Sequence, residues 1–462
     1  MSIKKGDILE LRVEKMAAGG MGIARLDGYV VFVKGGVPGD KVKARVYKKK
    51  KDYSEAKVLE VISPSEYRAE TGCQYCGYCG GCQWQHIKYD AQLAYKREIV
   101  KEALAKIGGL DNIPVMDTIP SPELFGYRNK MEFTFSNRPW LMPSQLEDNP
   151  ERPPFALGLH IPGSFNRVID IESCLLQPDK GNAILDIARE YVRKTQIPVY
   201  DMKSHQGFWR FLMLRNSKAF GVWMVNIITS EDAPQVLMPL ADEICRRIKG
   251  VRTVVNNVTR KKAAVAVGDN ELVLIGEGFI EEGIGDFRFR ISANSFFQTN
   301  SKAAENLYTK VREYAGLSGR EDVLDLYSGT GTIPIFISRE AKQILGIEIS
   351  RDGVIDAKNN CKINNIDNCE FVVGDIKEII PKIAFKADVI VIDPPRPGMH
   401  KEVTKMVLNM AAKKIVYVSC NPATMARDLG YISQDYEIKE IQPVDMFPHT
   451  HHIEAVAKCV KK

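Results

Sequence analysis

The feature that most constrains the fold is a regular alternation of helix-like and strand-like segments from about residue 301 to the end of the chain. The connections between these segments are short, so each helix returns the chain to a neighbouring strand through a right-handed crossover. This rhythm predicts a mainly parallel α/β sheet with helices on its faces. Open sheets of this kind bind ligands at the carboxyl ends of their strands, and the residues there are the candidates for chemistry.

A glycine-rich turn follows the first of these strands. The apolar segment 323–327 leads into Ser328-Gly329-Thr330-Gly331-Thr332, and an apolar helix is expected over 333–338. Glycines allow a ligand to approach the backbone closely, and the start of the helix offers free N–H groups. Glu348 ends the next strand, 17 residues after Gly331, where the hydroxyl groups of a ribose would need an acceptor.

Two more strand ends carry carboxylates, because Asp375 follows the segment 371–373 and Asp393 follows 389–392. Each carboxylate, taken singly, has a structural alternative as the cap of the next helix. Together with Glu348 they favour a nucleoside cofactor. Nothing downstream resembles a second mononucleotide-binding half, which disfavours a dinucleotide and favours S-adenosylmethionine.

A cysteine stands at the end of a further predicted strand. The segment 415–418 is followed by Ser419-Cys420-Asn421-Pro422, which places the thiol at the same predicted edge as the cofactor. A cysteine in this position often only fills a small packing space. Beside a methyl donor it has a chemical use, because carbon-5 of uracil attacks a methylsulfonium only after a nucleophile has added to carbon-6.

That reaction also needs a base, since the carbon-5 proton must leave before elimination can release the product. Candidates lie in the segment 447–454. Glu454, at the start of the last apolar strand, is the first choice, and His451 and His452 are the alternatives.

Motifs along essentially the whole chain resemble those of the RNA uridine-5-methyltransferase family. They are Asp325-Leu326-Tyr327-Ser328-Gly329-Thr330-Gly331, Asp393-Pro394-Pro395-Arg396, Ser419-Cys420-Asn421-Pro422-Ala423-Thr424, and Asp445-Met446-Phe447-Pro448-His449-Thr450 with Glu454, together with the segments 127–130 and 296–300. The resemblance implies that Cys420 is the nucleophile and Glu454 the base. It implies further that the methyl-donor site is lined by Gln298, Tyr327, Glu348 and Asp393, with Asp375 as a less distinct match.

Gly329 and Gly331 belong to the same predicted donor site through the turn that contains them. Structural interpretations stay open for two of the other residues. Gln298 would then only tie two loops together, and Tyr327 would be a core aromatic beside the glycine turn.

The N-terminal 64 residues are expected to form a small all-β barrel with strands over 8–13, 29–33, 41–47 and 56–62. They hold 14 Lys or Arg against 8 Asp or Glu, which accounts for the whole net charge of +6. Strict alternation in the third strand places Lys41, Lys43 and Arg45 on one face. This favours contact with a nucleic-acid backbone, the alternative being a solvated strand face.

The resemblance divides the chain into three domains. Residues 1–64 correspond to an OB-like barrel of the TRAM type, residues 65–285 to an α+β central domain, and residues 286–462 to a Rossmann-like class I methyltransferase. In the central domain the patterns predict strands over 130–135 and 220–228, helices over 89–107, 179–195 and 234–248, and an exposed loop over 137–154. Arg128 and Lys130 are either RNA contacts or solvated strand charges.

Four of the ten cysteines fall within ten residues, at Cys73, Cys76, Cys79 and Cys82. In a reducing compartment such a cluster indicates a metal or iron-sulfur site. The spacing alone selects Cys73, Cys76 and Cys79 as cluster ligands. It is close to that of a ferredoxin motif, but the last three-residue spacing and the proline of that motif are absent. The resemblance instead implies a 4Fe-4S cluster on Cys73, Cys79, Cys82 and Cys174. A structural zinc is the alternative, and the reaction outlined above would use neither group for electron transfer.

No apolar run approaches the roughly 20 residues of a membrane helix, and residues 1–15 are charged, so a soluble cytoplasmic protein without a membrane partner is expected. No obligate protein partner is evident. The sequence predicts an enzyme that methylates carbon-5 of a specific uridine in RNA from S-adenosylmethionine through a covalent adduct of Cys420 with carbon-6. The barrel and the cysteine cluster, typical of ribosomal members of the family, favour 23S ribosomal RNA.

Three other functions compete with this prediction. The first is the same reaction on transfer RNA. The second is methylation of an adenine or guanine amino group, suggested by Asp393-Pro394-Pro395 but weakened by Arg396, which stands where those enzymes carry an aromatic residue. The third, from a different class, is a non-catalytic RNA-binding or ribosome assembly factor, supported by the basic barrel.

Overall fold

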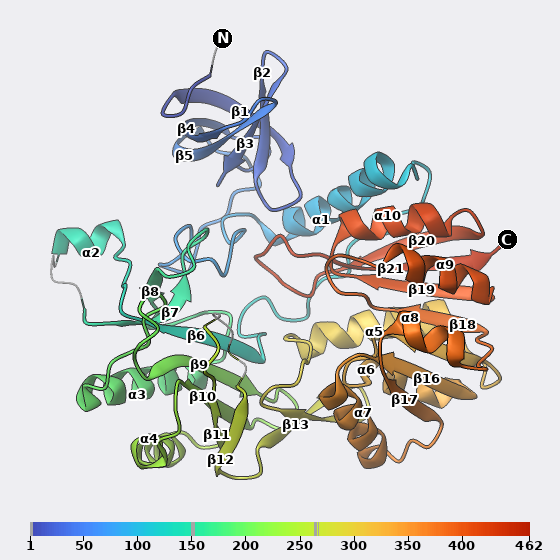
Figure 1. The fold of residues 1–462 in the computed structure, drawn as a ribbon. Coiled ribbons are helices and arrows are strands. Elements are labelled where there is room, and N and C mark those ends of the chain that lie inside the picture. Colours follow the sequence, from blue (N-terminus) through green and yellow to red (C-terminus); the bar gives the residue numbers. More distant parts are fainter. Residues whose placement is uncertain (1–2, 149–152, 263–265, 267) are drawn as a thin grey trace. The chain divides into compact units, whose positions relative to one another are not determined.

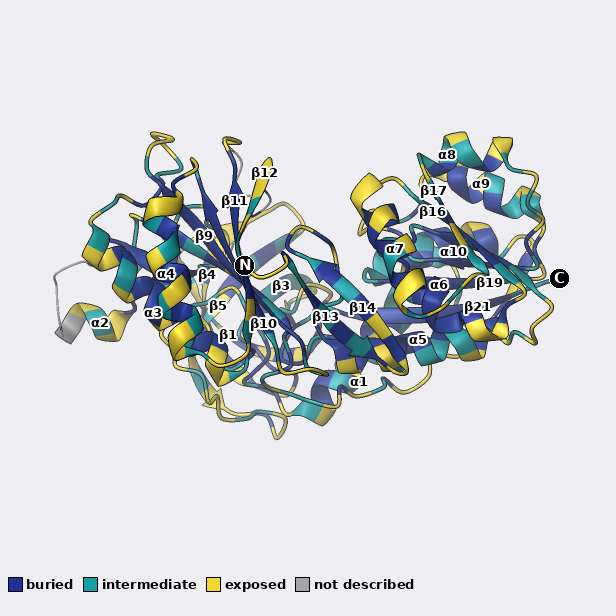
Figure 2. Cartoon of the chain, turned by 90° about the horizontal axis from the view of Figure 1, so that it is seen from below, coloured by how far each residue is buried: buried dark blue, intermediate teal, exposed yellow. Residues whose placement is uncertain are grey.

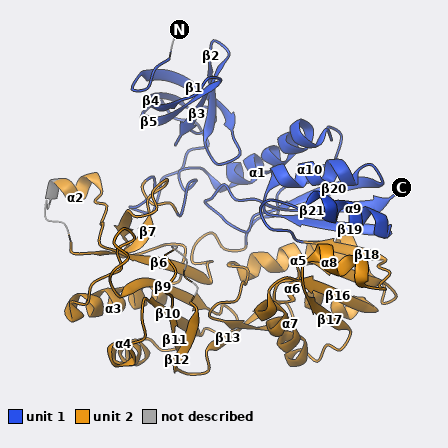
Figure 3. Cartoon of the chain, viewed as in Figure 1, with its two compact units in different colours: residues 1–77, 81–121, 393–462 blue, residues 78–80, 122–392 orange. Residues whose placement is uncertain are grey.

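The computed structural model describes residues 3–148, 153–262, 266 and 268–462. The chain forms two compact units (Figure 3). Unit 1 comprises residues 1–77, 81–121 and 393–462, and unit 2 comprises residues 78–80 and 122–392. No helix of the described residues combines the length and the apolar character that crossing a bilayer requires.

Unit 1 begins with a closed five-stranded barrel (Figure 1). Its strands are β1 (Ile8–Met16), β2 (Gly22–Leu26), β3 (Tyr29–Lys34), β4 (Lys41–Lys49) and β5 (Tyr53–Ser63), in the order β1-β2-β3-β5-β4. The four predicted strands are confirmed, whereas the short β2 between two turns was not predicted. Val42, Ala44 and Val46 are buried in the barrel core, as the alternation of β4 requires.

The charged face of β4 differs from the expected bare cationic surface. Lys41 Nζ lies 3.2 Å from Glu10 Oε2, and Lys43 Nζ lies 3.0 Å from Glu60 Oε2. The neighbouring strands β1 and β5 supply these glutamates, which pattern analysis of β4 alone does not reveal. Exposed pairs of this kind are weak, so the lysines can exchange a carboxylate for a phosphate at little cost.

The rest of unit 1 consists of one long helix and the C-terminal elements. Helix α1 (Tyr89–Ala103) continues as a π-helical turn, Leu104–Gly108, which confirms the predicted helix over 89–107. Strands β19 (Lys414–Ser419), β21 (Glu454–Lys461) and β20 (Tyr436–Val444) lie side by side in this order and are antiparallel. Helices α9 (Lys401–Met410) and α10 (Pro422–Ile432) precede and follow β19 in the chain.

Unit 2 contains a seven-stranded sheet in the order β12-β11-β10-β9-β6-β7-β8. Its strands are β6 (Lys130–Ser136), β7 (Ala156–His160), β8 (Val168–Asp170), β9 (Trp209–Asn216), β10 (Trp223–Thr229), β11 (Val251–Val258) and β12 (Asn270–Ile275). Every residue of β9 and β10 is buried, as Figure 2 shows by colour. Such continuous burial identifies them as the centre of the sheet.

The predicted elements of this region are present. Helix α3 (Asp179–Thr195) has the predicted bounds, and α4 (Pro234–Arg247) ends one residue earlier than expected. Strand β10 starts three residues later than the predicted 220. The expected loop over 137–154 carries a short helix, α2 (Pro143–Asp148), and its residues 149–152 lie outside the described part of the chain.

Unit 2 also holds a hairpin, a helix and four parallel strands. The hairpin is β13 (Phe279–Ile284) and β14 (Phe287–Ser292), followed by α5 (Ser301–Ala315). The parallel strands are β15 (Asp322–Leu326), β16 (Gln343–Glu348), β17 (Cys369–Val373) and β18 (Val389–Ile392), ordered β17-β16-β15-β18. The intervening helices are α6 (Thr332–Ile337), α7 (Arg351–Ile363) and α8 (Ile376–Ile379), with 3-10 turns Ser338–Glu340 and Ile380–Lys382. The predicted parallel arrangement is confirmed, so these strands end at one edge.

Candidate active site

The glycine turn after β15 has room for a ligand at one of its two glycines. A side chain at Gly329 would meet no atom within 4 Å, whereas at Gly331 it would come within 2.9 Å of Ala357 and Phe371. Both glycines have positive φ, +54° and +77°, which other residues rarely adopt. Gly331 therefore serves packing at the start of α6, and Gly329 leaves its side of the turn open.

Glu348, at the end of β16, is anchored to this turn. Its Oε2 accepts a hydrogen bond from the Gly329 N–H at 2.9 Å, and its Oε1 accepts one from the Ser350 N–H at 2.7 Å. The preceding Tyr327 adopts a left-handed conformation with φ +66°. A strained non-glycine residue beside a fixed carboxylate is typical of a binding site.

Two other predicted donor-site residues have structural partners. Asp375 caps helix α8, because its Oδ1 accepts the Lys377 N–H at 2.9 Å, which is the structural role considered from the sequence. The backbone carbonyl of Gln298 accepts a hydrogen bond from Asn129 Nδ2 at 2.8 Å, and Asn129 Nδ2 also bonds Ser301 Oγ at 2.7 Å. Gln298 takes part in this contact through its backbone carbonyl and not through its side-chain amide.

In unit 1, the register of two strands brings Cys420 opposite Glu454. Ser419, the last residue of β19, pairs with Ala455 of β21, so the next positions in this register are Cys420, directly after β19, and Glu454, the first residue of β21. The charge of Glu454 acts on the Cys420 thiol, which agrees with this placement. Facing side chains of antiparallel strands have Cβ atoms about 5 Å apart. Glu454 also pairs with Val444 of β20 on its other side. The thiol and the carboxyl group thus meet because one strand ends where its antiparallel neighbour begins.

Burial and charge raise the pKa of both groups. Burial, with the negative charges of Glu454 and Asp393, raises the pKa of the Cys420 thiol to about 11, and the Arg396 guanidinium opposes this shift. Burial, with the charge of Asp393, raises the pKa of Glu454 well above its usual range. Burial raises the pKa of Asp393 to about 6. The surroundings of Cys420 and Glu454 therefore disfavour the charged form of each group.

Hydrogen bonds tie the segment of Asp393 to the turn of Cys420. The carbonyl oxygen of Arg396 accepts from Asn421 Nδ2 at 3.1 Å and from Thr424 Oγ1 at 3.2 Å. Asn421 and Thr424 stand at the start of α10, one and four residues after Cys420. These two hydrogen bonds therefore hold the segment of Asp393 and the turn of Cys420 together.

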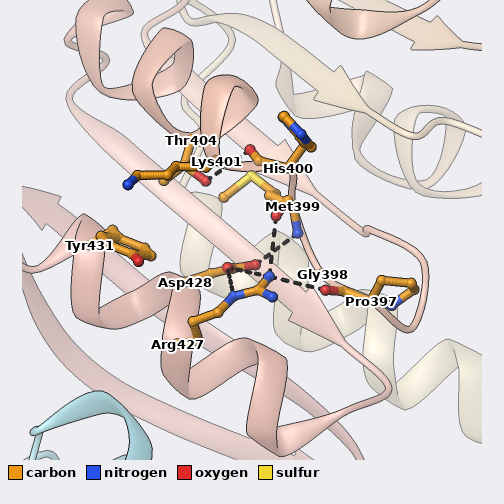
Figure 4. A pocket seen from close by; sticks show the side chains of 9 residues that line it. All are labelled: Pro397, Gly398, Met399, His400, Lys401, Thr404, Arg427, Asp428 and Tyr431. Atoms are coloured by element: carbon orange, nitrogen blue, oxygen red, sulfur yellow. Dashed lines mark hydrogen bonds and ion pairs between the residues drawn. The ribbon is translucent and has the colours of Figure 1, made fainter.

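A cavity of about 410 Å³ lies between the loop that follows Arg396 and helix α10, and Figure 4 shows the residues that line it. Arg427 donates to the carbonyls of Pro397 and Met399 at 3.0 and 3.1 Å. Its partner Asp428 accepts from the Met399 N–H at 2.8 Å and from the Tyr417 hydroxyl at 2.6 Å. Arg427 and Asp428 thus fasten the loop after Arg396 to helix α10 and strand β19.

Replacing Asp428 by alanine is expected to lower the free energy of unfolding by about 3 kcal/mol, because the buried Met399 N–H and Tyr417 hydroxyl lose their acceptor. Arg427 is 41% exposed, so the loss of its charge partner adds little. Urea unfolding followed by fluorescence measures the change. Glu402→Gln, at an exposed residue near the cavity, is the control, and equal midpoints for the two variants would contradict the assignment.

The two histidines considered as bases are placed differently from Glu454. Burial lowers the pKa of His451, and the nearby positive charges of Lys96 and Arg396 lower it further. Its ring lies 4.5 Å from that of His452, and its Nδ1 lies 3.3 Å from Gln83 Oε1. Neither histidine occupies the strand position opposite Cys420, which belongs to Glu454.

All ten cysteines lie in described parts of the chain, and none of them forms a disulfide. Cys73 and Cys76 share a tight turn in which the Cys76 N–H donates to the Cys73 carbonyl at 3.1 Å. Among the residues that the structure describes, no three His, Cys, Asp or Glu side chains gather closely enough to hold a metal ion. The thiols suit iron or zinc chemically, but the gathered site predicted from the sequence is not seen.

Sequence reasoning missed two buried polar residues of α1, Gln92 and Lys96, both with no exposed surface. Lys96 Nζ forms an ion pair of 2.5 Å with Asp445 Oδ1, which is also fully buried. A signal was present, because Gln92 and Lys96 continue the buried helical stripe of Ile99 and Val100 at the spacing of one helix face.

Comparisons with known proteins find two matching family models and relatives over nearly the full length of the chain. Residues 255–461 match the tRNA (Uracil-5-)-methyltransferase family, and residues 3–59 match the TRAM domain. A protein of Chlorobaculum tepidum described as an uncharacterized RNA methyltransferase is 40% identical, covering 98% of this chain and 96% of its own. One from Bacteroides thetaiotaomicron, described likewise, is also 40% identical, covering 96% of this chain and 99% of its own.

A solved structure of similar fold is the tRNA (uracil-54, C5)-methyltransferase of Pyrococcus abyssi in complex with S-adenosyl-L-homocysteine. It is 30% identical in sequence and has a TM-score of 0.76, with 98% of this chain and 100% of that chain covered. The N-terminal TRAM barrel and the Rossmann-like methyltransferase fold expected from the sequence are thereby confirmed.

Proposed function

Because the chain belongs to the RNA uracil-5-methyltransferase family of S-adenosylmethionine-dependent enzymes, we propose that it methylates one specific uridine of 23S ribosomal RNA through a covalent adduct of Cys420. The observation that carries the proposal is the strand register that sets Cys420 opposite Glu454. A thiol and a carboxyl group that act on each other electrostatically are the nucleophile and the base that the chemistry of uracil carbon-5 requires.

The proposed reaction assigns one task to each group. The Cys420 thiolate adds to carbon-6, and the electron pair of the C5–C6 double bond moves toward carbon-5. Carbon-5 would then attack the methyl group that bound S-adenosylmethionine supplies, and the electron pair of the broken S–CH3 bond would stay on the sulfur of the departing S-adenosylhomocysteine. Glu454 then takes the carbon-5 proton, its electron pair restores the double bond, and the C6–S bond breaks to return the Cys420 thiolate.

The proposed donor site joins the open turn at Gly329 with the anchored carboxylate of Glu348. Half-buried acceptors at a strand end suit the ribose of S-adenosylmethionine. The other residues assigned to this site are Gln298, Tyr327, Gly331, Asp375 and Asp393. Asp375 has the weakest support, since its carboxylate caps a helix.

The rate of methylation is expected to rise with pH. The Cys420 pKa of about 11 leaves only a small thiolate fraction at neutral pH. This fraction grows about tenfold for each pH unit below the pKa, so log(kcat/KM) should climb by about one unit per pH unit from pH 6 to 9. A stopped assay with radiolabelled methyl donor measures it, and a flat or falling profile would contradict the assignment.

Ribosomal RNA is preferred as substrate because the N-terminal barrel and the cysteine cluster resemble those of ribosomal members of the family. Transfer RNA is the second candidate, favoured by the likeness to the P. abyssi enzyme, whose description names tRNA uracil-54. Mass mapping of 5-methyluridine in both RNA classes, from cells with and without the gene, separates the two. Loss of the modification from 23S RNA alone supports the proposal, and loss from transfer RNA alone overturns it.

The proposal extends to the layout of the chain. The barrel of residues 1–64 and the central domain of residues 65–285 would grip the RNA in the cytoplasm, while residues 286–462 carry out the methylation. Lys41, Lys43 and Arg45 of the barrel are the proposed phosphate contacts, together with Arg128 and Lys130.

A 4Fe-4S cluster on Cys73, Cys79, Cys82 and Cys174 is also proposed, with zinc as the alternative. Its support is the resemblance to the family, which implies these four ligands, together with thiols that form no disulfide. No step of the reaction passes through it. Iron and sulfide analysis of anaerobically purified protein, with an absorption spectrum, tests the assignment, and a colourless protein with one zinc would refute the cluster.

A further inference from the structure

The loop between β20 and β21 leads directly to Glu454 and is held by a buried amide on α1. Gln92 has no exposed surface, and its Oε1 accepts the backbone N–H of His449 at 2.9 Å. Its Nε2 lies 2.9 Å from the Ile87 carbonyl, 3.1 Å from the Trp84 carbonyl and 3.2 Å from His449 Nδ1. One side chain thus joins three chain segments.

His449 has a conformation that needs such support. Its φ is +65°, in the left-handed region that side chains other than glycine rarely adopt. Its carbonyl oxygen accepts the backbone N–H groups of Gln83 and Trp84 at 3.0 and 2.9 Å. A strained residue of this kind persists only where its surroundings over-determine it, and these contacts provide that.

Lys96, one helical turn after Gln92, holds the start of the same loop. Besides its ion pair with Asp445 Oδ1, its Nζ donates to the Phe447 carbonyl at 3.2 Å. Asp445 Oδ1 also accepts the Phe447 N–H at 3.1 Å. The segment 445–449 is therefore fastened to α1 at both ends, and Glu454 begins β21 five residues later.

We propose that Gln92 is a positioning residue that holds the left-handed turn at His449 and thereby keeps Glu454 opposite Cys420 for removal of the carbon-5 proton. The inference rests on the proposed function of Glu454 as base. Cys420 sits on the other strand, in the turn tied to Arg396, so its addition to carbon-6 does not depend on Gln92. In the step concerned, the proton passes to the Glu454 carboxylate and the sulfur leaves carbon-6 with its bonding electrons.

The test separates formation of the covalent RNA–protein complex from its breakdown. Gln92→Met keeps the length of the side chain but removes its polar atoms, so Glu454 loses its fixed position. Formation of the complex should stay within about twofold of wild type, while its breakdown slows about 10- to 100-fold, the cost of a misplaced group. The complex should then accumulate on denaturing gels of rapid-quench reactions with uridine RNA and methyl donor.

Rescue provides a readout that a general loss of stability would not give. Glycine adopts the left-handed turn without strain, so the double variant Gln92→Met/His449→Gly should regain most of the breakdown rate. Lys101→Met, on the exposed side of the same helix, is the control and should match wild type. If Gln92→Met does not fold, Gln92→Asn, whose amide is one methylene too short to accept the His449 N–H, replaces it in the same comparison with the same expected slowing of breakdown.

The experiment distinguishes failure of the proposed function from failure of the positioning role of Gln92. If wild-type enzyme forms no covalent complex with RNA and makes no 5-methyluridine, the proposed function is wrong. If wild type does both, but Gln92→Met changes formation and breakdown by the same factor or changes neither, the positioning role is overturned. Failure of the His449→Gly substitution to restore breakdown would also overturn it.

Discussion

Replacing Cys420 by alanine should abolish methylation, with kcat reduced by at least about 10⁴-fold, as expected when the nucleophile of a covalent mechanism is removed. Without the thiol, nothing adds to carbon-6, and carbon-5 stays too electron-poor to attack the methyl donor. Incorporation of radiolabelled methyl groups into RNA measures the loss. A second measurement is the covalent complex of the protein with 5-fluorouridine RNA, which should no longer be detected on denaturing gels.

Cys245→Ala is the matched control for this substitution. Cys245 is also a partly buried thiol, but it lies on α4, outside the residues assigned to catalysis. It should retain full activity and the adduct. Methylation by the Cys420→Ala variant at more than a small fraction of the wild-type rate would show that the reaction does not use a covalent thiol.

Glu454→Gln should reduce kcat by about 10²- to 10⁴-fold, the usual contribution of a general base. The amide is close to the carboxyl group in shape, but it cannot take the carbon-5 proton. Because Cys420 and its turn are unchanged, addition and methyl transfer still occur, and the methylated adduct should accumulate. Mass spectrometry of the trapped RNA–protein complex identifies it.

Glu437→Gln serves as control, because Glu437 is an exposed residue of the neighbouring strand β20 whose partner is Lys439. It should behave as wild type. If the Glu454→Gln variant is active, another group must act as the base, and His451 and His452 are the first candidates to test. An inactive variant without adduct would place Glu454 in an earlier step.

Much of the fold was readable from local pattern. The helix of residues 179–195 has the predicted bounds because its apolar residues recur at helical spacing. The strand of residues 389–392 has them because a short run of β-branched residues favours a buried strand. The parallel order of the strands that end at Glu348 and Asp375 followed from their alternation with helices. Strand β2 was missed, since five residues between two turns carry too short a pattern.

Other features depended on partners distant in the chain. The lysines of β4 carry a clear pattern, but the glutamates beside them come from β1 and β5. Asp375 could bind a ligand or cap a helix, and only its hydrogen bond to Lys377 shows that it caps. Gln92 and Lys96 look like ordinary polar helix residues until their partners His449 and Asp445, about 350 positions away, are known.

By itself the sequence determined the motifs, the kinds of element and the placement of a cysteine after a buried strand, because these depend on neighbouring residues. Only the tertiary structure decided which group faces that cysteine, since the antiparallel register of β19 and β21 chose Glu454 over two nearby histidines. It also decided in which direction the pKa of each of the two groups is shifted. Burial and the charges of Asp393 and Arg396 act through space, and no local pattern records their sum.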